Sequence, residues 1–166
     1  MTMIEKTYPL IEKLILNALQ LAHQLHQELN LEADTLKKTQ EAELIQNIAA
    51  NKKQLVAQLE QFNTQLGQIL ATEKLPNDRE SLKTYFQRAE AAGLPTAESV
   101  DGWSQLMLIC SECKALNEQN GMSIDLLSRR TNRSLHILKG KPEFANTYGP
   151  DGSTQSDLHS RSLVSV

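Results

Sequence analysis

The chain has 166 residues, which is about the length of one domain. Its hydrophobic share of 40% is too high for a disordered chain, while its aromatic share is only 4%. Seven Gly and five Pro disfavour a β-sandwich or β-barrel, because those folds need turn residues at short, regular intervals. We therefore expect a helical protein with a core of aliphatic side chains.

The charge balance excludes several classes of partner. The net charge is -3, and the 17 basic and 20 acidic side chains are interspersed, so no single-signed field exists to hold nucleic acid. No apolar run approaches the roughly 18 residues of a membrane span. Glu5, Glu12 and Lys13 stand where a signal peptide would need its basic and apolar regions. We expect a cytoplasmic protein that does not insert directly into a membrane.

Two apolar patterns of helical spacing occupy the first part of the chain. Steps of three, four and seven predict a first helix over about 8–37, at Ile11, Ile15, Ala18, Ala22, Leu25, Leu29 and Leu36. A second pattern predicts a helix over about 40–72, at Ile45, Ile48, Leu55, Leu59, Phe62, Leu66 and Ile69. Similar lengths and a short joint favour an antiparallel hairpin.

A third long helix is expected after a connector over 73–96, which contains Pro76, Pro95 and a short helical segment at 79–91. An unbroken alternation of three and four residues predicts this helix over 97–139. Residues 140–166 lose the pattern and should form a flexible tail. The expected fold is therefore all-α: an elongated antiparallel bundle or coiled coil of three long helices in a domain over 1–139, followed by the tail.

The third helix carries Asn117 and Asn120 in the middle of its apolar seam. Polar residues at such positions weaken packing and set register or partner choice, so this seam could await a helix from another protein. Alternatively, both residues flank a kink at Gly121 and meet water, and spacing alone favours this second interpretation.

Residues with catalytic or metal-binding potential are few. Cys110 and Cys113 have the CxxC spacing but lie within a helix without a second pair, so buried small side chains are favoured over a metal or redox site. His23 and His26 lack a Glu-x-x-His partner motif. Phosphate-binding and nucleophile-elbow motifs are absent from the sequence. We predict no enzyme, no cofactor and no metal. Basic residues over 129–141 either complement a helix C-terminus or bind an acidic partner.

Three segments together suggest a family. They are Lys52, Leu55 and Leu59 after Ile48; Leu116-Asn117-Glu118-Gln119-Asn120-Gly121 with Arg130, Leu135, Leu138 and Lys139; and Thr147-Tyr148-Gly149-Pro150-Asp151-Gly152 before Ser153-Thr154. In these segments the chain resembles the flagellar export chaperone family FlgN. The connector with Pro76 and Pro95 departs from that pattern.

The resemblance implies a chaperone of the flagellar type III export system. Such a protein binds the C-terminal helical segments of the hook-associated proteins FlgK and FlgL, prevents their aggregation and delivers them to the cytoplasmic domain of the export gate, FlhA. We hypothesise that the cargo-binding residues are Asn117, Asn120, Ile124, Leu127, Thr131, Leu135 and Leu138. The residues expected to dock on the export gate are Tyr148, Gly149, Asp151 and Gly152. The alternative is a structural coiled-coil oligomerisation or adaptor protein, and the sequence leaves a homodimer open.

Overall fold

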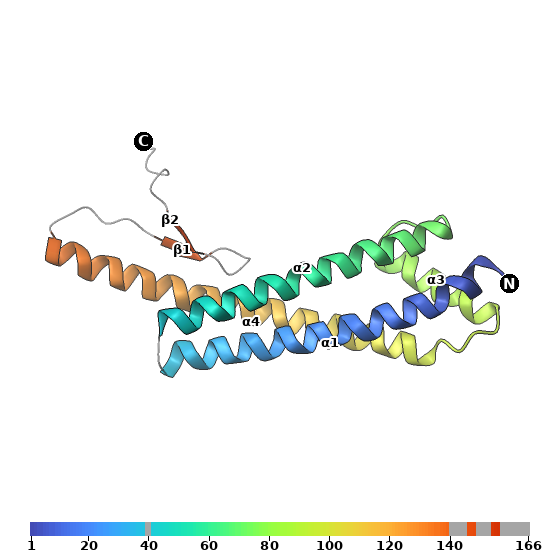
Figure 1. Ribbon diagram of the computed structural model, residues 1–166, viewed down its shortest axis with the longest axis horizontal. Helices are drawn as coiled ribbons and strands as arrows, with labels where there is room; N and C mark the ends of the chain where they lie inside the picture. Colours follow the sequence, from blue (N-terminus) through green and yellow to red (C-terminus); the bar gives the residue numbers. More distant parts are fainter. Residues whose placement is uncertain (39–40, 140–145, 149–153, 157–166) are drawn as a thin grey trace. The chain divides into compact units, whose positions relative to one another are not determined.

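The computed structural model describes residues 1–38, 41–139, 146–148 and 154–156, and beyond Ile124 it describes only the course of the backbone. These residues form four helices, α1 (Met3–Lys38), α2 (Ala42–Thr72), α3 (Arg79–Ala91) and α4 (Ala97–Lys139) (Figure 1). Two three-residue strands follow, β1 (Asn146–Tyr148) and β2 (Thr154–Ser156). The packed part of the chain is all-helical, which confirms the predicted fold class at that level.

Helix α1 begins five residues earlier than expected because of a capping box that the periodicity did not reveal. The Thr2 hydroxyl accepts from the Glu5 amide at 3.4 Å, and the Glu5 carboxylate accepts from the Thr2 amide. This reciprocal arrangement satisfies backbone donors that a helix start otherwise leaves unpaired. These bonds to the Glu5 carboxylate also lower its pKa. Pro9 therefore lies inside α1, near its start, rather than ahead of it.

Helix α3 has clear signals at both ends. Asp78 caps its start, where the side chain accepts from the Ser81 amide at 2.7 Å, and this bond lowers the pKa of the Asp78 carboxyl. Beyond its end, Gly93 has a φ of 83°, a conformation that glycine adopts without strain. The turn is closed by the Leu94 amide, which donates to the Ala89 carbonyl at 3.0 Å.

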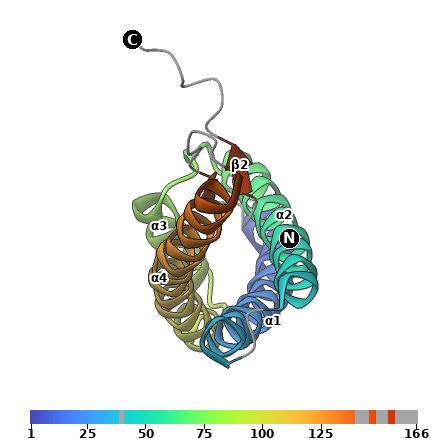
Figure 2. The same ribbon diagram turned by 90° about the vertical axis from the view of Figure 1, so that its left-hand side faces the viewer.

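The contacts divide the chain into two compact units, and long helices run through both. Unit 1 comprises Met1–His26 and Gln54–Glu112. Its core is a contiguous apolar cluster to which all four helices contribute, with Ile11, Leu70, Tyr85 and Leu106 at most 1% exposed. Trp103, the only tryptophan of the chain, packs against this cluster. Figures 1 and 2 show α3 lying against the other helices of this unit.

Two buried tyrosines tie the elements of unit 1 together. The Tyr8 hydroxyl lies 2.8 Å from the Pro95 carbonyl and 3.0 Å from Ser99 Oγ, which joins α1 to the start of α4. The Tyr85 hydroxyl lies 2.6 Å from Thr7 Oγ1 and joins α3 to α1. Burial raises the pKa of both phenols, so both act as neutral hydrogen-bonding groups.

Unit 2 comprises Gln27–Lys53 and Cys113–Val166. It contains the end of α1, the start of α2, the remainder of α4 and the two strands. The strands pair antiparallel, with Tyr148 opposite Thr154. Apart from these two strands, the expected flexible tail over 140–166 lies outside the described residues. Its separation from a domain over 1–139 therefore stays a prediction.

The apolar cluster of unit 1 gives a direct stability test. Leu70 is fully buried, whereas Leu16 on α1 is 64% exposed. Leu70→Ala should lower the free energy of unfolding by about 2–5 kcal/mol, because it removes buried apolar area and leaves a cavity. Leu16→Ala is the matched control and should change it by less than about 0.5 kcal/mol. Urea denaturation measures both, and equal effects would contradict the assigned core.

Candidate functional site

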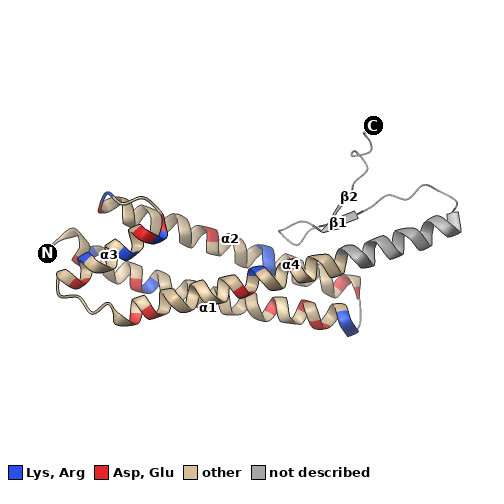
Figure 3. Cartoon of the chain, turned by 180° about the vertical axis from the view of Figure 1, so that it is seen from behind, with Lys and Arg blue, Asp and Glu red and all other residues tan. Residues whose placement is uncertain are grey.

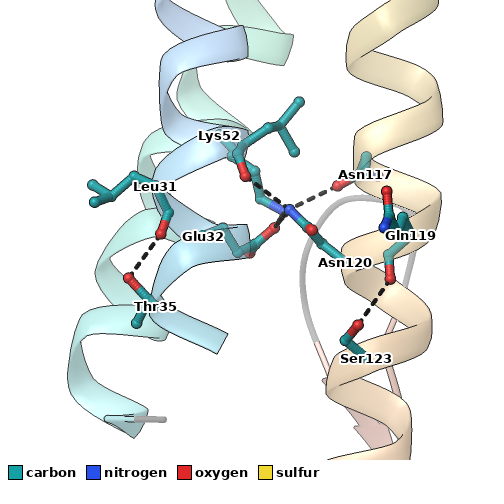
Figure 4. Close-up of polar contacts among 9 residues, drawn as sticks. Leu31, Glu32, Thr35, Lys52, Asn117, Gln119, Asn120 and Ser123 are labelled. Carbon is teal, nitrogen blue, oxygen red and sulfur yellow. Dashed lines mark hydrogen bonds and ion pairs between the residues drawn. The ribbon is translucent and has the colours of Figure 1, made fainter. Parts of the chain in front are cut away.

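A buried polar cluster lies inside unit 2, in which three helices meet (Figure 4). We define it as Glu32 of α1, Lys52 of α2, and Asn117 and Asn120 of α4. The side chains of Glu32 and Lys52 are 0% and 4% exposed, and Asn120 is 2% exposed. Three polar side chains therefore occupy buried positions at which a helical bundle ordinarily places aliphatic residues, and the half-buried Asn117 lies beside them.

The ion pair of Lys52 with Glu32 forms the centre of the cluster. Lys52 Nζ lies 2.9 Å from Glu32 Oε1 and donates to Asn117 Oδ1 at the same distance. Asn120 Nδ2 donates to the same Glu32 oxygen at 3.0 Å. One carboxylate oxygen thus accepts from both α2 and α4 while it is held on α1.

Asn120 also donates to the Leu29 carbonyl at 2.9 Å. Asn117 and Asn120 are thus hydrogen-bonded within the chain and do not flank a water-exposed kink, and α4 continues as a helix through Gly121. The interpretation that spacing alone favoured is therefore wrong. A partner for these amides exists within the chain, since the apolar faces of α1 and α2 carry a carboxylate and an ammonium at this level.

The cluster contains residues that carry the resemblance to the family. Lys52, Asn117 and Asn120 come from two of the three segments that carry the resemblance, and folding brings them together. The periodicity analysis missed Glu32, the residue on which they converge. Glu32 lies between Leu29 and Leu36 at the same helical spacing, so a charged residue within an apolar stripe was the available signal.

Energetically, this cluster specifies an arrangement more than it adds stability. Removing an ion pair from water costs several kcal/mol, and the attraction and hydrogen bonds within the protein roughly offset that cost. Loss of one partner is expensive, because the other charge is left buried without compensation. Hydrogen bonds are also directional, so the four donor–acceptor distances constrain how α4 lies on α1 and α2.

Within unit 2, α4 extends well beyond the ends of α1 and α2. Asn120 lies level with Glu32, to which it is bonded. From there α1 continues for six residues to Lys38, whereas α4 continues for nineteen to Lys139, in the same direction (Figure 1). At 1.5 Å per residue these lengths are roughly 9 Å and 28 Å.

Helix α2 begins at nearly the same level of α4 as that at which α1 ends. Lys52 is bonded to Asn117, and Ala42, the first residue of α2, lies ten residues back, level with about residue 127 of α4. We call residues 127–139 the α4 extension. Among the described residues of unit 2, neither α1 nor α2 runs alongside it (Figure 1).

The predicted cargo-binding residues divide between the cluster and the extension. Asn117 and Asn120 belong to the cluster, and Ile124, 6% exposed, follows one turn later. The extension contains the remaining four, Leu127, Thr131, Leu135 and Leu138. Among the residues expected to dock on the gate, Tyr148 is the last residue of β1, while Gly149, Asp151 and Gly152 lie outside the described residues.

The cysteines and histidines whose side chains the structure describes are Cys110, Cys113, His23 and His26. Cys110 and Cys113 form no disulfide, and burial raises the pKa of the Cys110 thiol, which makes it a poor nucleophile. His26 lies 3.4 Å from Glu112. In the part of the chain that the structure describes, no group of three or more His, Cys, Asp or Glu could hold a metal ion.

The distribution of charge and the apolar character of the helices bear on binding to nucleic acids and membranes. Figure 3 shows acidic and basic residues interspersed along the described helices, with no helix of a single sign of charge. None of the helices, over the residues described, combines the length and apolar character needed to cross a membrane.

Comparison with known proteins identifies the family. A family model described as FlgN protein matches residues 3–156, which is nearly the whole chain. The chain belongs to the FlgN family. FlgN is a family of flagellar export chaperones that bind hook-associated proteins, and it is not known as a family of enzymes. No curated protein and no solved structure matches the chain significantly.

The ion pair in this FlgN protein can be tested by a double-mutant cycle. Lys52→Met and Glu32→Leu should each lower the free energy of unfolding by about 3–5 kcal/mol, because each leaves the other charge buried without its countercharge. Glu32→Leu combined with Lys52→Met should recover most of this loss, since both charges are removed. Lys13→Met, at an exposed position of α1, is the matched control and should have little effect. Additive losses in urea denaturation would show that the pair is not coupled.

Proposed function

We propose that this protein is a cytoplasmic flagellar type III export chaperone that binds the C-terminal helical segments of FlgK and FlgL. It prevents their premature aggregation and delivers them to the cytoplasmic domain of FlhA. The observation that carries this proposal is the α4 extension, a helix that continues for about 20 Å beyond the end of α1. The elongated antiparallel arrangement of the three long helices is part of the same proposal.

The extension has the residue pattern that a partner helix requires. Leu127, Thr131, Leu135 and Leu138 continue the alternation of three and four residues that places side chains on one helical face. An amphipathic cargo helix, whose apolar face is meant for assembly outside the cell, would aggregate unless another helix covered that face. The extension supplies a complementary stripe, with Ile124 at its root.

Asn117 and Asn120 take a different part in this proposal from the one their spacing suggested. Because their side chains are bonded to Lys52, Glu32 and the Leu29 carbonyl, they hold α4 in place. Ile124 is buried one turn later, so direct contact with cargo is left to the extension. Thr131 is the polar residue that would set the register of the cargo helix.

The tail is proposed to dock on FlhA. Tyr148 pairs with Thr154 across the two strands, so the segment 149–153 joins them. Gly149, Asp151 and Gly152 in this joining segment suit a turn, and a tyrosine beside it can serve as an aromatic anchor with a polar end.

A second candidate is a structural coiled-coil oligomerisation or adaptor protein. The extension favours it to the extent that the same stripe could pair with a second copy of the chain. Sedimentation analysis distinguishes the two: a tight homodimer that excludes cargo supports the structural protein, whereas a one-to-one complex with cargo supports the chaperone.

Leu135→Asp and Leu127→Asp should each weaken binding to the C-terminal segments of FlgK and FlgL at least tenfold, because they place a carboxylate on the apolar stripe. Asn132→Asp is the matched control, since it adds the same charge about 100° from the centre of the stripe around the helix axis. It should leave affinity within about threefold. Calorimetry measures all three. Unchanged affinity in both stripe variants would remove the extension from the cargo site.

Tyr148→Ala should weaken docking on the FlhA cytoplasmic domain at least tenfold and leave cargo affinity unchanged, because it removes the aromatic anchor alone. Tyr148→Phe keeps the ring and should retain much of the affinity. A chain that ends at Lys141 should still bind cargo. If the truncated chain lost cargo binding, the cargo site would belong to the tail instead.

A further inference from the structure

Burial of the polar cluster carries a desolvation free energy that its hydrogen bonds and ion pair only roughly offset. A contribution to stability therefore does not explain its presence. Glu32 and Lys52 are almost fully excluded from water, and apolar residues of similar size at such positions are often neutral or stabilising by comparison. The cluster is therefore best understood through what its directional bonds specify.

Among the side chains of unit 2 that the structure describes, fully buried apolar residues are few. The contiguous apolar cluster lies entirely in unit 1, whereas the buried hydrophobic residues described in unit 2 are only Leu29, Leu36, Ile48, Cys113 and Ile124. Apolar contacts between helices tolerate rotation and tilt, since they are not directional. At Asn117 and Asn120 the side chains that α4 turns toward α1 and α2 are amides. Hydrogen bonds therefore determine the orientation of α4 at this point.

We propose that the Glu32–Lys52–Asn117–Asn120 cluster is a positioning device that sets the direction in which the α4 extension leaves α1 and α2. Lys52 Nζ holds one oxygen of α1 and one oxygen of α4 at equal distances of 2.9 Å. Asn120 adds a bond to a backbone carbonyl of α1, which a rotated or tilted α4 would lose. The three helices are thus fixed against one another at a single level.

Because α4 is long beyond the cluster, a small change of its angle at the cluster is amplified at the far end of the extension. The backbone of α4 continues as one helix from Asn120 to Lys139, about 28 Å away. A tilt of about 10° at the cluster would move the far end by roughly 5 Å, which is the size of a whole side chain. The orientation of the proposed cargo stripe therefore depends on four side chains at its base. This consequence for cargo rests on the proposed function, whereas the positioning itself does not.

Distance measurements within unit 2 test the positioning directly. Spin labels would be attached at Asp34→Cys on α1 and His136→Cys on the extension, in a chain in which Cys110 and Cys113 are replaced by alanine. Both labelled positions lie in unit 2, and double electron–electron resonance gives the distribution of distances between them. The native cluster should give one narrow distribution.

The decisive variant combines Glu32→Leu, Lys52→Met and Asn120→Leu. Its thermal stability should equal or exceed that of the native chain, while the width of the distance distribution should at least double. Asn117→Ala, at a half-buried position, keeps the ion pair and should broaden the distribution less; it serves as the measurement if the triple variant does not fold. Glu118→Gln, exposed on the same helix, is the control and should leave the distribution unchanged.

A narrow, unshifted distribution in the folded triple variant, or in Asn117→Ala if the triple variant does not fold, would overturn the proposal. Affinity for the FlgK and FlgL segments is measured on the same proteins, and the triple variant should bind at least fivefold more weakly. If the native chain binds neither segment, the proposed function fails, but the distance distributions still decide whether the cluster positions the extension.

Discussion

A single carboxylate oxygen, Glu32 Oε1, is the point on which unit 2 depends. It accepts from Lys52 and from Asn120 while both donors are shielded from water. Because an uncompensated charge at such depth is costly, the three residues must remain together for any one of them to be tolerated. The ion pair and hydrogen bonds at Glu32 therefore hold the three helices together, and a few buried apolar side chains complete the packing.

The two units rely on different physical interactions. Unit 1 buries a contiguous set of aliphatic and aromatic side chains, and two buried tyrosine hydroxyls join α1 to α3 and to the start of α4. Unit 2 depends on charge and amide chemistry at one level of its helices. An apolar core confers stability with little directional demand, whereas a polar network confers a defined geometry at little net gain.

Much of the fold was predictable because periodicity alone identifies long amphipathic helices, and the third long helix and the short α3 occupy the ranges expected. The start of α1 was missed because a Thr2–Glu5 capping box is local chemistry that an apolar pattern does not register. The interpretation of Asn117 and Asn120 as residues flanking a water-exposed kink was wrong for a different reason. Their satisfaction depends on Glu32 and Lys52, which are distant in sequence, and one helix examined by itself cannot show which partners the others supply.

The distribution of aromatic residues has a consequence for how this protein can be observed. Trp103 is the only tryptophan, and it packs on the apolar cluster of unit 1. Its fluorescence therefore reports the environment of that cluster. Local opening around Glu32 and Lys52 would leave this signal largely unchanged, because no indole lies in unit 2. A native-like emission spectrum is thus compatible with a chain whose unit 2 has already lost its order, and only a probe placed beyond His26 and before Gln54, or after Glu112, would detect that loss.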